Sequence, residues 1–404
     1  MTKNKSYVMF AAAFFMWFSV YAYLPNFTPY METGPRGFSP AMIGIIIGSY
    51  GLSQMILRIP VGLLSDKLGT RKLFITLGMV FTVISGLLLF LSDHFMVILI
   101  ARVCAGAAVS TWVSFMVLFS SYYDKDKTVK AAGTLNFFNN MGQLGGIIFG
   151  TLLTRYSSLE DRAAFLLAAA AGVTAFILSF AIYEDRQKIN IKTAQKGEAD
   201  KPARFADVIS NRNLIIISII GTVSQLVTFS TIFGFTPAYA RAEFNIGPLE
   251  NGALMFFSYI PTAFGALFLG RYLSGRFKEY KLVVTGMLLM GATTVLIPFT
   301  TDYYTLIITQ VIAGFGRGIS FPLLMGLSIK NFRENQRGAA MGVFQAVYSF
   351  GMFFGPFITG LINENFELGA AFIFIGSICL VCTAASYFVL RKLDFSDCTP
   401  PGHN

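Results

Sequence analysis

The chain has 404 residues, of which 54% are hydrophobic and 13% charged, and its formal net charge at pH 7 is +10. So few charges exclude a soluble globular protein, because such a protein needs a charged surface. A net charge this positive would suggest nucleic acid as a partner of a soluble protein, but in this chain the apolar runs explain it differently.

Apolar runs long enough to cross a bilayer recur from one end of the chain to the other. A membrane-spanning helix needs about 20 residues, and the runs predict twelve spans with no sizeable soluble domain between them. The first run is too long for a cleaved signal peptide and lacks a small-residue cleavage site, so we expect it to be retained. The predicted spans are residues 7–31, 41–64, 73–92, 96–121, 131–154, 163–183, 214–240, 249–270, 281–300, 303–328, 339–362 and 369–390.

The lysines and arginines outside the spans are divided unequally between the two sets of connections. One set, which includes both termini, holds 24 of them, and the other holds only Arg36, Arg155, Arg162 and Arg241. Because positive residues concentrate on the cytoplasmic side of a membrane, this asymmetry predicts a multi-pass protein of the cytoplasmic (inner) membrane with both termini in the cytoplasm. The net charge then follows from topology, and we expect no nucleic-acid partner.

The polar stretch 184–213 separates the spans into two groups of six. We therefore predict an N-terminal six-helix bundle (1–183), a cytoplasmic linker (184–213), and a C-terminal six-helix bundle with a short cytoplasmic tail (214–404). Glycine motifs recur between the groups at an offset of 208 or 209 residues, which predicts two pseudo-symmetric bundles related by an axis along the membrane normal. The matched residues are Gly62 with Gly270, Arg102 and Gly106 with Gln310 and Gly314, and Gly142 and Gly146 with Gly351 and Gly355.

The connection between spans two and three carries a glycine, an acid and a basic cluster: Gly62-Leu-Leu-Ser-Asp66-Lys67-Leu-Gly69-Thr-Arg71-Lys72. This stretch resembles the signature of the major facilitator superfamily. The resemblance implies an all-α membrane fold of twelve helices and a transporter that works by alternating access. It also implies that the stretch contacts the start of span eleven and latches the outward-facing state; a plain topological loop is the alternative. The predicted latch residues are Gly62, Asp66, Lys67, Gly69 and Arg71.

Two further motifs bear on the branch of this family. The stretch from Arg102 to Gly106 resembles a motif frequent in its proton-linked drug exporters. The stretch from Gly142 to Gly150 resembles the exporters' third motif only in part, since Ile147 stands where that motif has proline. A proton-linked multidrug exporter and a lipid flippase therefore remain alternatives to a transporter of small organic solutes.

Three arginines, Arg58, Arg102 and Arg317, lie inside the predicted spans, and no acid joins them. A charge at the bilayer centre costs about 2.5–3.5 kcal/mol on the mildest scale. Arginine recognises carboxylate and phosphate through paired hydrogen bonds, so we predict a small anionic or zwitterionic organic cargo. A buried carboxylate that carries protons is not expected, which leaves uniport, exchange with a counter-substrate, or protonation of the cargo.

The three arginines are expected to differ in role. Arg317 is near the middle of its span and has no counterpart at the matching Val109, which leaves two interpretations: contact with the cargo, or bonds to backbone carbonyls or a neighbouring amide. Arg102 belongs to a family motif, which favours a shared structural or coupling role over recognition. Arg58 is near the cytoplasmic end of its span, and we expect its long side chain to reach the interface.

Other candidate residues follow from polar and aromatic positions on the spans that, as the resemblance implies, surround the central cavity. Four amides of span five share one helical face, and they either bind cargo or hold helices together. The predicted substrate-binding set is Arg317, Gln310, Arg102, Tyr21, Trp17, Asn136, Asn139, Asn140, Gln143, Gln225, Gln345 and Tyr348.

Nothing in the sequence predicts a catalytic centre, a metal site or a cofactor. Cys379 and Cys382 form a CxxC inside an apolar helix, where packing is the better interpretation. His94 and His403 lie outside the spans. The expected partners are a small-molecule substrate, the lipid bilayer and either protons or a counter-substrate, and we expect a monomer.

Overall fold

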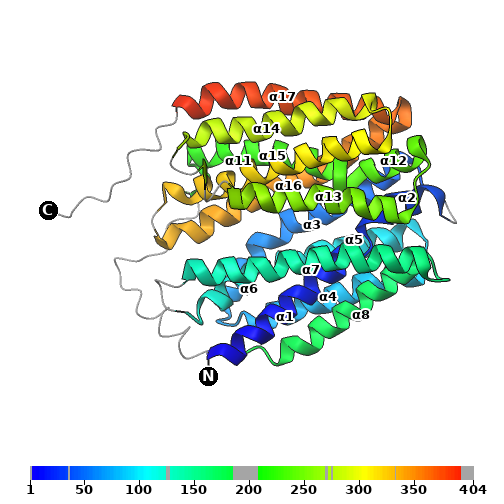
Figure 1. The fold of residues 1–404 in the computed structure, drawn as a ribbon. Coiled ribbons are helices and arrows are strands. Elements are labelled where there is room, and N and C mark those ends of the chain that lie inside the picture. The colour runs from blue at the N-terminus through cyan, green and yellow to red at the C-terminus, as the bar shows by residue number, and fades with distance from the viewer. Residues whose placement is uncertain are drawn as a thin grey trace.

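The computed structural model describes residues 2–34, 37–123, 128–184, 208–268, 272–273, 276–332 and 334–392. Within these ranges the chain forms helices and no strand, and the helices line up as twelve antiparallel rods (Figure 1). The first six rods are α1 (Thr2–Tyr21) with α2 (Leu24–Thr33), α3 (Pro40–Lys67), α4 (Lys72–Leu91), α5 (Phe95–Ser110) with α6 (Trp112–Ser120), α7 (Thr128–Tyr156) and α8 (Asp161–Phe180).

The second six rods repeat this pattern. They are α11 (Arg212–Ser230) with the π-helical turn η3 (Thr231–Phe235) and α12 (Thr236–Phe244), α13 (Pro248–Phe268), α14 (Glu279–Leu296) with the 3₁₀ turn η5 (Ile297–Phe299), α15 (Tyr303–Lys330), α16 (Glu334–Asn365) and α17 (Leu368–Lys392).

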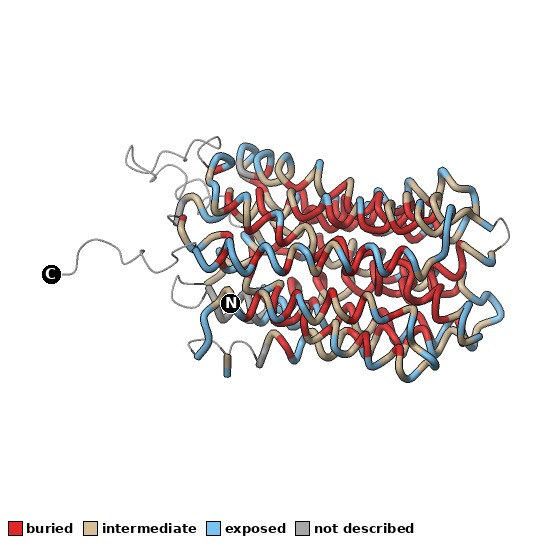
Figure 2. Tube along the Cα trace, turned by 90° about the horizontal axis from the view of Figure 1, so that it is seen from above, coloured by how far each residue is buried: buried red, intermediate tan, exposed pale blue. Residues whose placement is uncertain are grey.

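Ten of these rods, as far as the chain is described, are long and apolar enough to cross a membrane. Buried residues gather where the rods face one another, and exposed residues follow their outer faces (Figure 2). Many of the exposed side chains are large and apolar, such as Leu91, Phe180 and Phe388. An apolar outer surface of this kind suits lipid rather than water.

The two ends of the molecule differ in charge and in chain connections. Both described chain ends, Thr2 and Lys392, lie at one end of the rods (Figure 1). That end, named the basic end here, also carries Lys67, Lys72 and Lys330. The other end is named the opposite end. Because the rods alternate in direction, each odd-numbered rod runs from the basic end to the opposite end.

The internal repeat is visible in how glycines let two helices approach. A Cβ atom added to Gly106 of α5 would lie 2.3 Å from the carbonyl oxygen of Tyr50 on α3. A Cβ added to Gly314 of α15 would lie 2.2 Å from the carbonyl oxygen of Ser258 on α13. Both members of one contact are offset by 208 residues from those of the other. The predicted fold of twelve helices in two pseudo-symmetric bundles is therefore confirmed, whereas most of the predicted linker, 184–213, lies outside the described residues.

The bundles meet along two seams, and the closest backbone contacts of both lie toward the opposite end. At the α3–α16 seam, a Cβ added to Gly44 would lie 2.4 Å from the carbonyl oxygen of Pro356. At the α7–α13 seam, a Cβ added to Gly252 would lie 2.4 Å from the side chain of Thr151. Backbones this close leave no room for cargo to pass, so the opposite end is closed in this conformation.

Rods one and seven are both interrupted halfway, at matching positions. The first rod breaks between Tyr21 and Leu24, and the seventh changes to a π-helical turn at Thr231. These breaks reorient side chains and free backbone carbonyls in the middle of the molecule. One such carbonyl, at Gly234, accepts a 2.6 Å hydrogen bond from the hydroxyl of Thr28 in the other bundle.

Candidate functional site

A small cavity of about 10 Å³, which has room for roughly one water molecule, lies between the two bundles, next to the breaks in rods one and seven. It is formed by residues of both bundles, so a molecule held there contacts both of them. Its lining residues are Val20, Tyr21, Leu24, Tyr50 and Arg102 from the N-terminal bundle, and Phe229 and Phe233 from the C-terminal bundle.

Aromatic rings make most of the cavity wall. The ring of Tyr50 stacks on that of Phe229 with centroids 5.9 Å apart and planes 20° apart. Tyr21 meets Phe233 edge-on at 5.8 Å, and Phe229 and Phe233 are 5.1 Å apart. Each of the first two contacts joins one ring from each bundle. The ring arrangement therefore depends on how the bundles sit against each other.

Arg102 supplies the charge at this cavity. It is only 2% exposed, and its Nη1 donates a 2.9 Å hydrogen bond to the hydroxyl of Tyr23. Its Cζ lies 4.8 Å from the ring centroid of Tyr50 and 5.4 Å from that of Phe27. Its Nε is buried without a hydrogen-bond partner. A guanidinium with an unused buried donor is a group that a ligand anion can complete.

Arg317 lies one layer of rings away from the cavity and is not among its lining residues. Its Cζ is 5.8 Å from the ring centroids of both Phe233 and Tyr259. Its Nη2 donates to the hydroxyl of Thr262 at 2.8 Å and to the hydroxyl and carbonyl of Ser258 at 3.1 and 3.3 Å. Arg317 therefore has neutral partners on α13, and its contact with cargo stays a prediction.

Arg58 does not extend to the interface, so that expectation is wrong. It is 8% exposed, and its Nη1 donates hydrogen bonds of 2.8 Å to Gln345 and 2.6 Å to the hydroxyl of Tyr348, both on α16 of the other bundle. Its Nη2 donates to Gln54, one turn earlier on α3. Amide and hydroxyl acceptors on two helices occupy both terminal nitrogens of the guanidinium, while its Nε is buried without a partner. Gln345 and Tyr348, predicted at the cargo site, are held by this arginine.

The four amides of α7 divide into a buried pair and an exposed pair. Asn139 and Gln143 are buried, and Gln143 donates a 2.5 Å hydrogen bond to Asn139. Asn136 and Asn140 are exposed. The same helix packs against α1 and touches α13 through Thr151. This placement is compatible with both predicted roles, cargo binding and helix association.

The remaining predicted residues are buried near the centre. Trp17 lies 6.0 Å from the ring of Tyr21 and 5.5 Å from that of Trp112, and its indole nitrogen is buried without a partner. Gln225 on α11 and Gln310 on α15 are also buried. Of the twelve predicted residues, only Tyr21 and Arg102 line the cavity, and their contact with cargo stays a prediction.

Tyr50, Phe229 and Phe233 were missed by the sequence reading. The chain has 42 phenylalanines and 17 tyrosines, so aromatic spacing distinguishes no particular ring. Phe229 lies just before the π-helical turn Thr231–Phe235, and Phe233 lies within it. The local sequence does not predict a π-helical turn, so it does not distinguish these two rings from the others.

The loop predicted as a latch contacts its own bundle in this conformation. The carboxylate of Glu184 accepts hydrogen bonds from the Thr70 hydroxyl at 2.8 Å and from the backbone nitrogens of Arg71 and Lys72 at 2.5 and 3.2 Å. It thereby caps the start of α4, where a negative charge is favourable. Gly69 adopts a φ of 62°, a left-handed conformation that suits glycine.

The other predicted latch residues show no docking onto the second bundle. A Cβ added to Gly62 would meet no atom within 4 Å. Lys67 is exposed at the last turn of α3, and the side chain of Asp66 lies outside the described part of the chain. The proposed contact with span eleven is therefore still a prediction, and it concerns a conformation other than this one.

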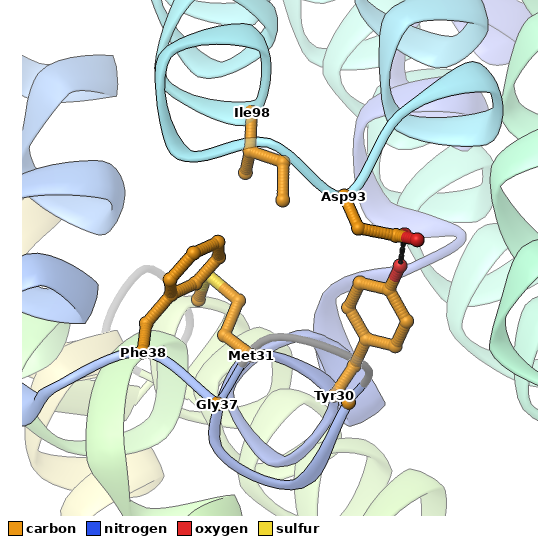
Figure 3. A pocket seen from close by; sticks show the side chains of 7 residues that line it. Tyr30, Met31, Gly37, Phe38, Asp93 and Ile98 are labelled. Atoms are coloured by element: carbon orange, nitrogen blue, oxygen red, sulfur yellow. Dashed lines mark hydrogen bonds between the residues drawn. The ribbon is translucent and has the colours of Figure 1, made fainter.

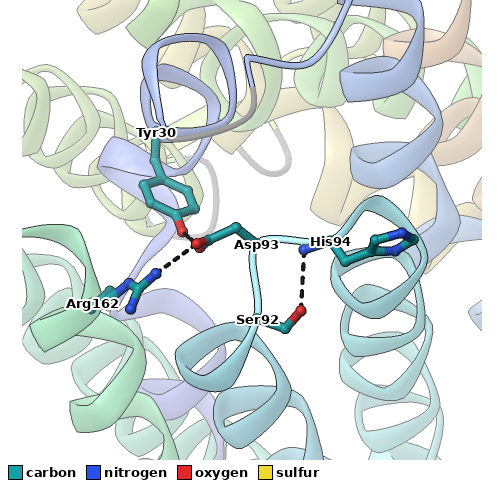
Figure 4. A network of polar contacts seen from close by, with 5 residues as sticks. All are labelled: Tyr30, Ser92, Asp93, His94 and Arg162. Atoms are coloured by element: carbon teal, nitrogen blue, oxygen red, sulfur yellow. Dashed lines mark hydrogen bonds and ion pairs between the residues drawn. The ribbon is translucent and has the colours of Figure 1, made fainter.

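A second cavity of about 10 Å³ lies at the opposite end, lined by Tyr30, Met31, Phe38, Asp93 and Ile98 together with two glycines (Figure 3). Its only carboxylate is already engaged. Asp93 accepts a 2.6 Å bond from Arg162 and another from the Tyr30 hydroxyl (Figure 4). This network ties α2, the α4–α5 connection and α8 together. It is a structural contact within one bundle, away from the central cavity.

No metal site emerges from the described residues, since they include no group of three or more histidine, cysteine, aspartate or glutamate side chains placed to hold an ion. Cys379 is buried and its thiol lies 3.5 Å from the carbonyl oxygen of Met287 on α14. This geometry agrees with packing as the role of that cysteine.

Comparison with protein families now identifies the class. The model described as Major Facilitator Superfamily matches residues 9–272 and 218–397. The chain belongs to this superfamily and is a multi-pass membrane transporter.

Individual relatives are distant but nearly full length. The chain is 24% identical over 366 residues to the quinolone resistance protein NorA of Staphylococcus aureus (strain COL), covering 89% of each chain. It is 22% identical over 399 residues to the proton-coupled antiporter flippase LtaA of Staphylococcus aureus (strain USA300), covering 96% of each.

Solved structures share the fold. The nucleoside transporter NupG superposes with a TM-score of 0.73 at 15% identity, over 96% of this chain and 100% of that one. A bacterial homolog of the human lysosomal transporter Spinster, in an inward-facing and occupied conformation, gives a TM-score of 0.75 at 14% identity, over 96% of both chains. At this identity the likeness concerns the fold alone.

Proposed function

We propose that this transporter moves a small organic anion, or a zwitterion with an acidic group, across the cytoplasmic membrane by alternating access. One observation carries the proposal. In the described residues, Arg58, Arg102 and Arg317 lie among the rods, the first two buried and the third half-buried, and all of their hydrogen-bond partners are neutral. Three positive charges inside the bundles without an acidic partner favour a negatively charged cargo and oppose a cationic one.

The energetic argument rests on the cost of the charges. Each arginine at the centre of a bilayer costs about 2.5–3.5 kcal/mol even on mild scales, and hydroxyl and amide partners recover only part of that cost. An anionic cargo recovers more, because charge-assisted hydrogen bonds are roughly twice as strong as neutral ones. Binding energy from the anion then becomes available to shift the conformational equilibrium.

The closed opposite end supports an inward-facing assignment. If the basic end faces the cytoplasm, as the charge asymmetry predicts, the backbone contacts of Gly44 and Gly252 close the external side. Near the basic end, a Cβ added to Gly62, Gly338 or Gly342 would meet no atom within 4 Å. Alternating access requires a second conformation in which these contacts are exchanged.

Coupling to protons through a buried carboxylate is not supported by the described part of the chain. Glu32 lies in the last turn of α2 and Glu250 in the first turn of α13, both at the opposite end and away from the three arginines. Uniport, exchange, or co-transport of a proton on the cargo itself is therefore favoured. The expected partner besides the cargo is the bilayer, and a monomer contains the whole cavity.

A proton-linked multidrug exporter is the second candidate, favoured by the similarity to NorA and by the stretch from Arg102 to Gly106. Against it stands Ile147, which is buried in α7 where the exporter motif has proline. Resistance to a drug panel in a sensitised host separates this candidate from an organic-anion transporter. A lipid flippase, suggested by the similarity to LtaA, is tested by translocation of a labelled lipid in proteoliposomes.

The proposal is tested by a thermal-shift screen of organic acids, peptides and drugs on the purified full chain. A true ligand raises the midpoint of unfolding by mass action. We expect stabilisation by one or more organic acids. Stabilisation by cationic drugs with no response to any acid would overturn the anionic assignment and favour the exporter.

A further inference from the structure

The contact that closes the opposite end contains polar side chains that closure buries and leaves poorly bonded. We infer that three of them, Asn26, Thr151 and Asn251, destabilise the closed contact and so make the opposite end easier to open than an apolar contact would. They are named the seam polar residues here. Their role concerns the balance between two conformations and does not depend on which cargo is carried.

The seam polar residues lie where rods of both bundles meet. Asn26 is on α2 and Thr151 on α7, both in the first bundle, and Asn251 is on α13 of the second. Helix α13 packs against both α2 and α7. The residues are 5%, 5% and 1% exposed, in that order. They are therefore inside the contact between the bundles and not at its rim.

The hydroxyl of Thr151 gains nothing from this burial. A Cβ added to Gly252 would lie 2.4 Å from both the hydroxyl oxygen and the methyl carbon of Thr151, so the end of this side chain rests on the α13 backbone. Within the described residues the oxygen has no hydrogen-bond partner, and less than 1 Å² of it is accessible to water. A hydroxyl that loses water without gaining a partner opposes burial.

The amides of Asn26 and Asn251 meet across the contact but bond weakly. Nδ2 of Asn251 donates to Oδ1 of Asn26 at 3.5 Å, which is long for a hydrogen bond. As far as the chain is described, Oδ1 of Asn251 accepts no bond, and less than 1 Å² of it is accessible to water. The bond from Thr28 to the carbonyl of Gly234, by contrast, is 2.6 Å long. The same interface thus holds one strong bond and several unmet polar atoms.

The cost of these unmet atoms exists only while the opposite end is closed. When α13 moves away from α2 and α7, water can reach the Thr151 hydroxyl and the two amides. A cost confined to one conformation shifts the equilibrium toward the other. One buried polar group without a partner changes the ratio of the two conformations by about fivefold or more. Replacing the polar atoms by apolar ones of the same shape should therefore favour closure.

The experiment measures how fast Leu24→Cys, in a background without other cysteines, reacts with a thiol reagent that does not cross membranes. The reagent is applied on the side that the opposite end faces. The rate is proportional to the fraction of molecules open at that end, even when this fraction is small. Thr151→Val exchanges the hydroxyl for a methyl group and takes no partner from another residue. We expect it to lower the labelling rate about fivefold.

A second variant carries Asn26→Leu and Asn251→Leu together. Both amides are removed at once, because a single substitution would leave the other amide buried without its partner. We expect this double variant to label at least as slowly as Thr151→Val.

Two controls separate this effect from a general change in stability. Thr151→Ser keeps the hydroxyl and is expected to label close to the parent's rate. Ser85→Ala removes another hydroxyl that is buried without a partner in the described chain, but Ser85 is on α4, which packs against α5 and α8 of its own bundle. We expect Ser85→Ala to leave the labelling rate unchanged, since its hydroxyl is buried in both conformations.

The inference is overturned if Thr151→Val purifies normally and labels as fast as the parent or faster. An equal fall in Ser85→Ala also overturns it, because the effect would then come from stability in general. If Thr151→Val does not fold, the double amide variant is judged by the same criterion. Labelling needs no cargo, so the proposed function fails or holds separately, in the thermal-shift screen.

Discussion

Arg58 on α3 and Tyr348 on α16 are joined by a 2.6 Å hydrogen bond that crosses from one bundle to the other. The Cζ of Arg58 also lies 5.3 Å from the ring centroid of Tyr348. Both residues are buried, at 8% and 7% exposure. The contact lies nearer to the basic end than the contacts that Gly44 and Gly48 of α3 make with α16. It therefore joins the two helices outside the region where their backbones touch.

The first prediction concerns this contact. Tyr348→Phe removes the hydroxyl acceptor and leaves Arg58 with one cross-bundle partner, Gln345. We expect the free energy of unfolding to fall by about 1 kcal/mol, the usual size of one such bond inside a membrane protein. Thermal unfolding in detergent measures the change. Tyr304→Phe is the control, since Tyr304 is 75% exposed, and equal effects in the two variants would show that the contact contributes nothing.

The second prediction concerns Arg317. Arg317→Ala is expected to abolish transport of the true cargo while the protein still inserts and purifies normally. The reason is that removing a positive charge from the centre weakens the attraction for an anion arriving next to Phe233. Uptake into proteoliposomes, normalised to the amount of inserted protein, measures it. Near-normal transport by a well-expressed variant would show that Arg317 only braces α13 through Thr262 and Ser258.

The third prediction concerns closure of the opposite end. A Cβ added to Gly48 would lie 2.7 Å from the carbonyl oxygen of Phe353, so Gly48→Ala pushes α3 away from α16. We expect the population to shift toward conformations open at that end. The readout is labelling of Leu24→Cys, in a background without other cysteines, by a thiol reagent that does not cross membranes.

Gly342→Ala is the matched control for this shift, because a Cβ there meets no atom within 4 Å. Labelling from the opposite end should rise several-fold in Gly48→Ala and stay unchanged in Gly342→Ala. Identical labelling in both variants would mean that the glycine seam does not control access.

The fourth prediction concerns pH. Because the described rods hold no carboxylate in their central part, we expect any effect of a pH gradient to follow the protonation of the cargo. Glu32→Gln and Glu250→Gln should therefore keep the gradient dependence of the parent protein. Flux into proteoliposomes with and without a gradient tests this. Gradient-driven transport that disappears when one of these acids is removed would refute it.

The fold was predictable because its signals are long and redundant. Twelve apolar runs, the unequal distribution of positive residues and the offset of 208 residues all point to the same two-bundle arrangement. The repeat persists at the level of single contacts, as Gly106 on Tyr50 and Gly314 on Ser258 show. Such agreement arises because close helix packing in a membrane depends on small residues at fixed positions.

The site was predictable only in part, because its residues are brought together by contacts between the bundles. Arg58 looked like an interfacial residue on its own helix, and its partners lie almost three hundred positions away on α16. The carboxylate of Glu184, in the predicted linker, caps a loop more than a hundred positions earlier. Tyr50 and Phe229 face each other only after the bundles dock. None of these pairings leaves a local sequence signal.

The central claim is that the cargo is anionic, and counterflow tests it most directly. Proteoliposomes preloaded with an unlabelled organic acid identified by the thermal-shift screen are diluted into a trace of the same acid carrying a radioactive label. The account predicts a transient accumulation of label that the acid's amide derivative does not support and that Arg102→Gln lacks. Accumulation driven equally well by the neutral amide, or by a cationic analogue, would contradict it.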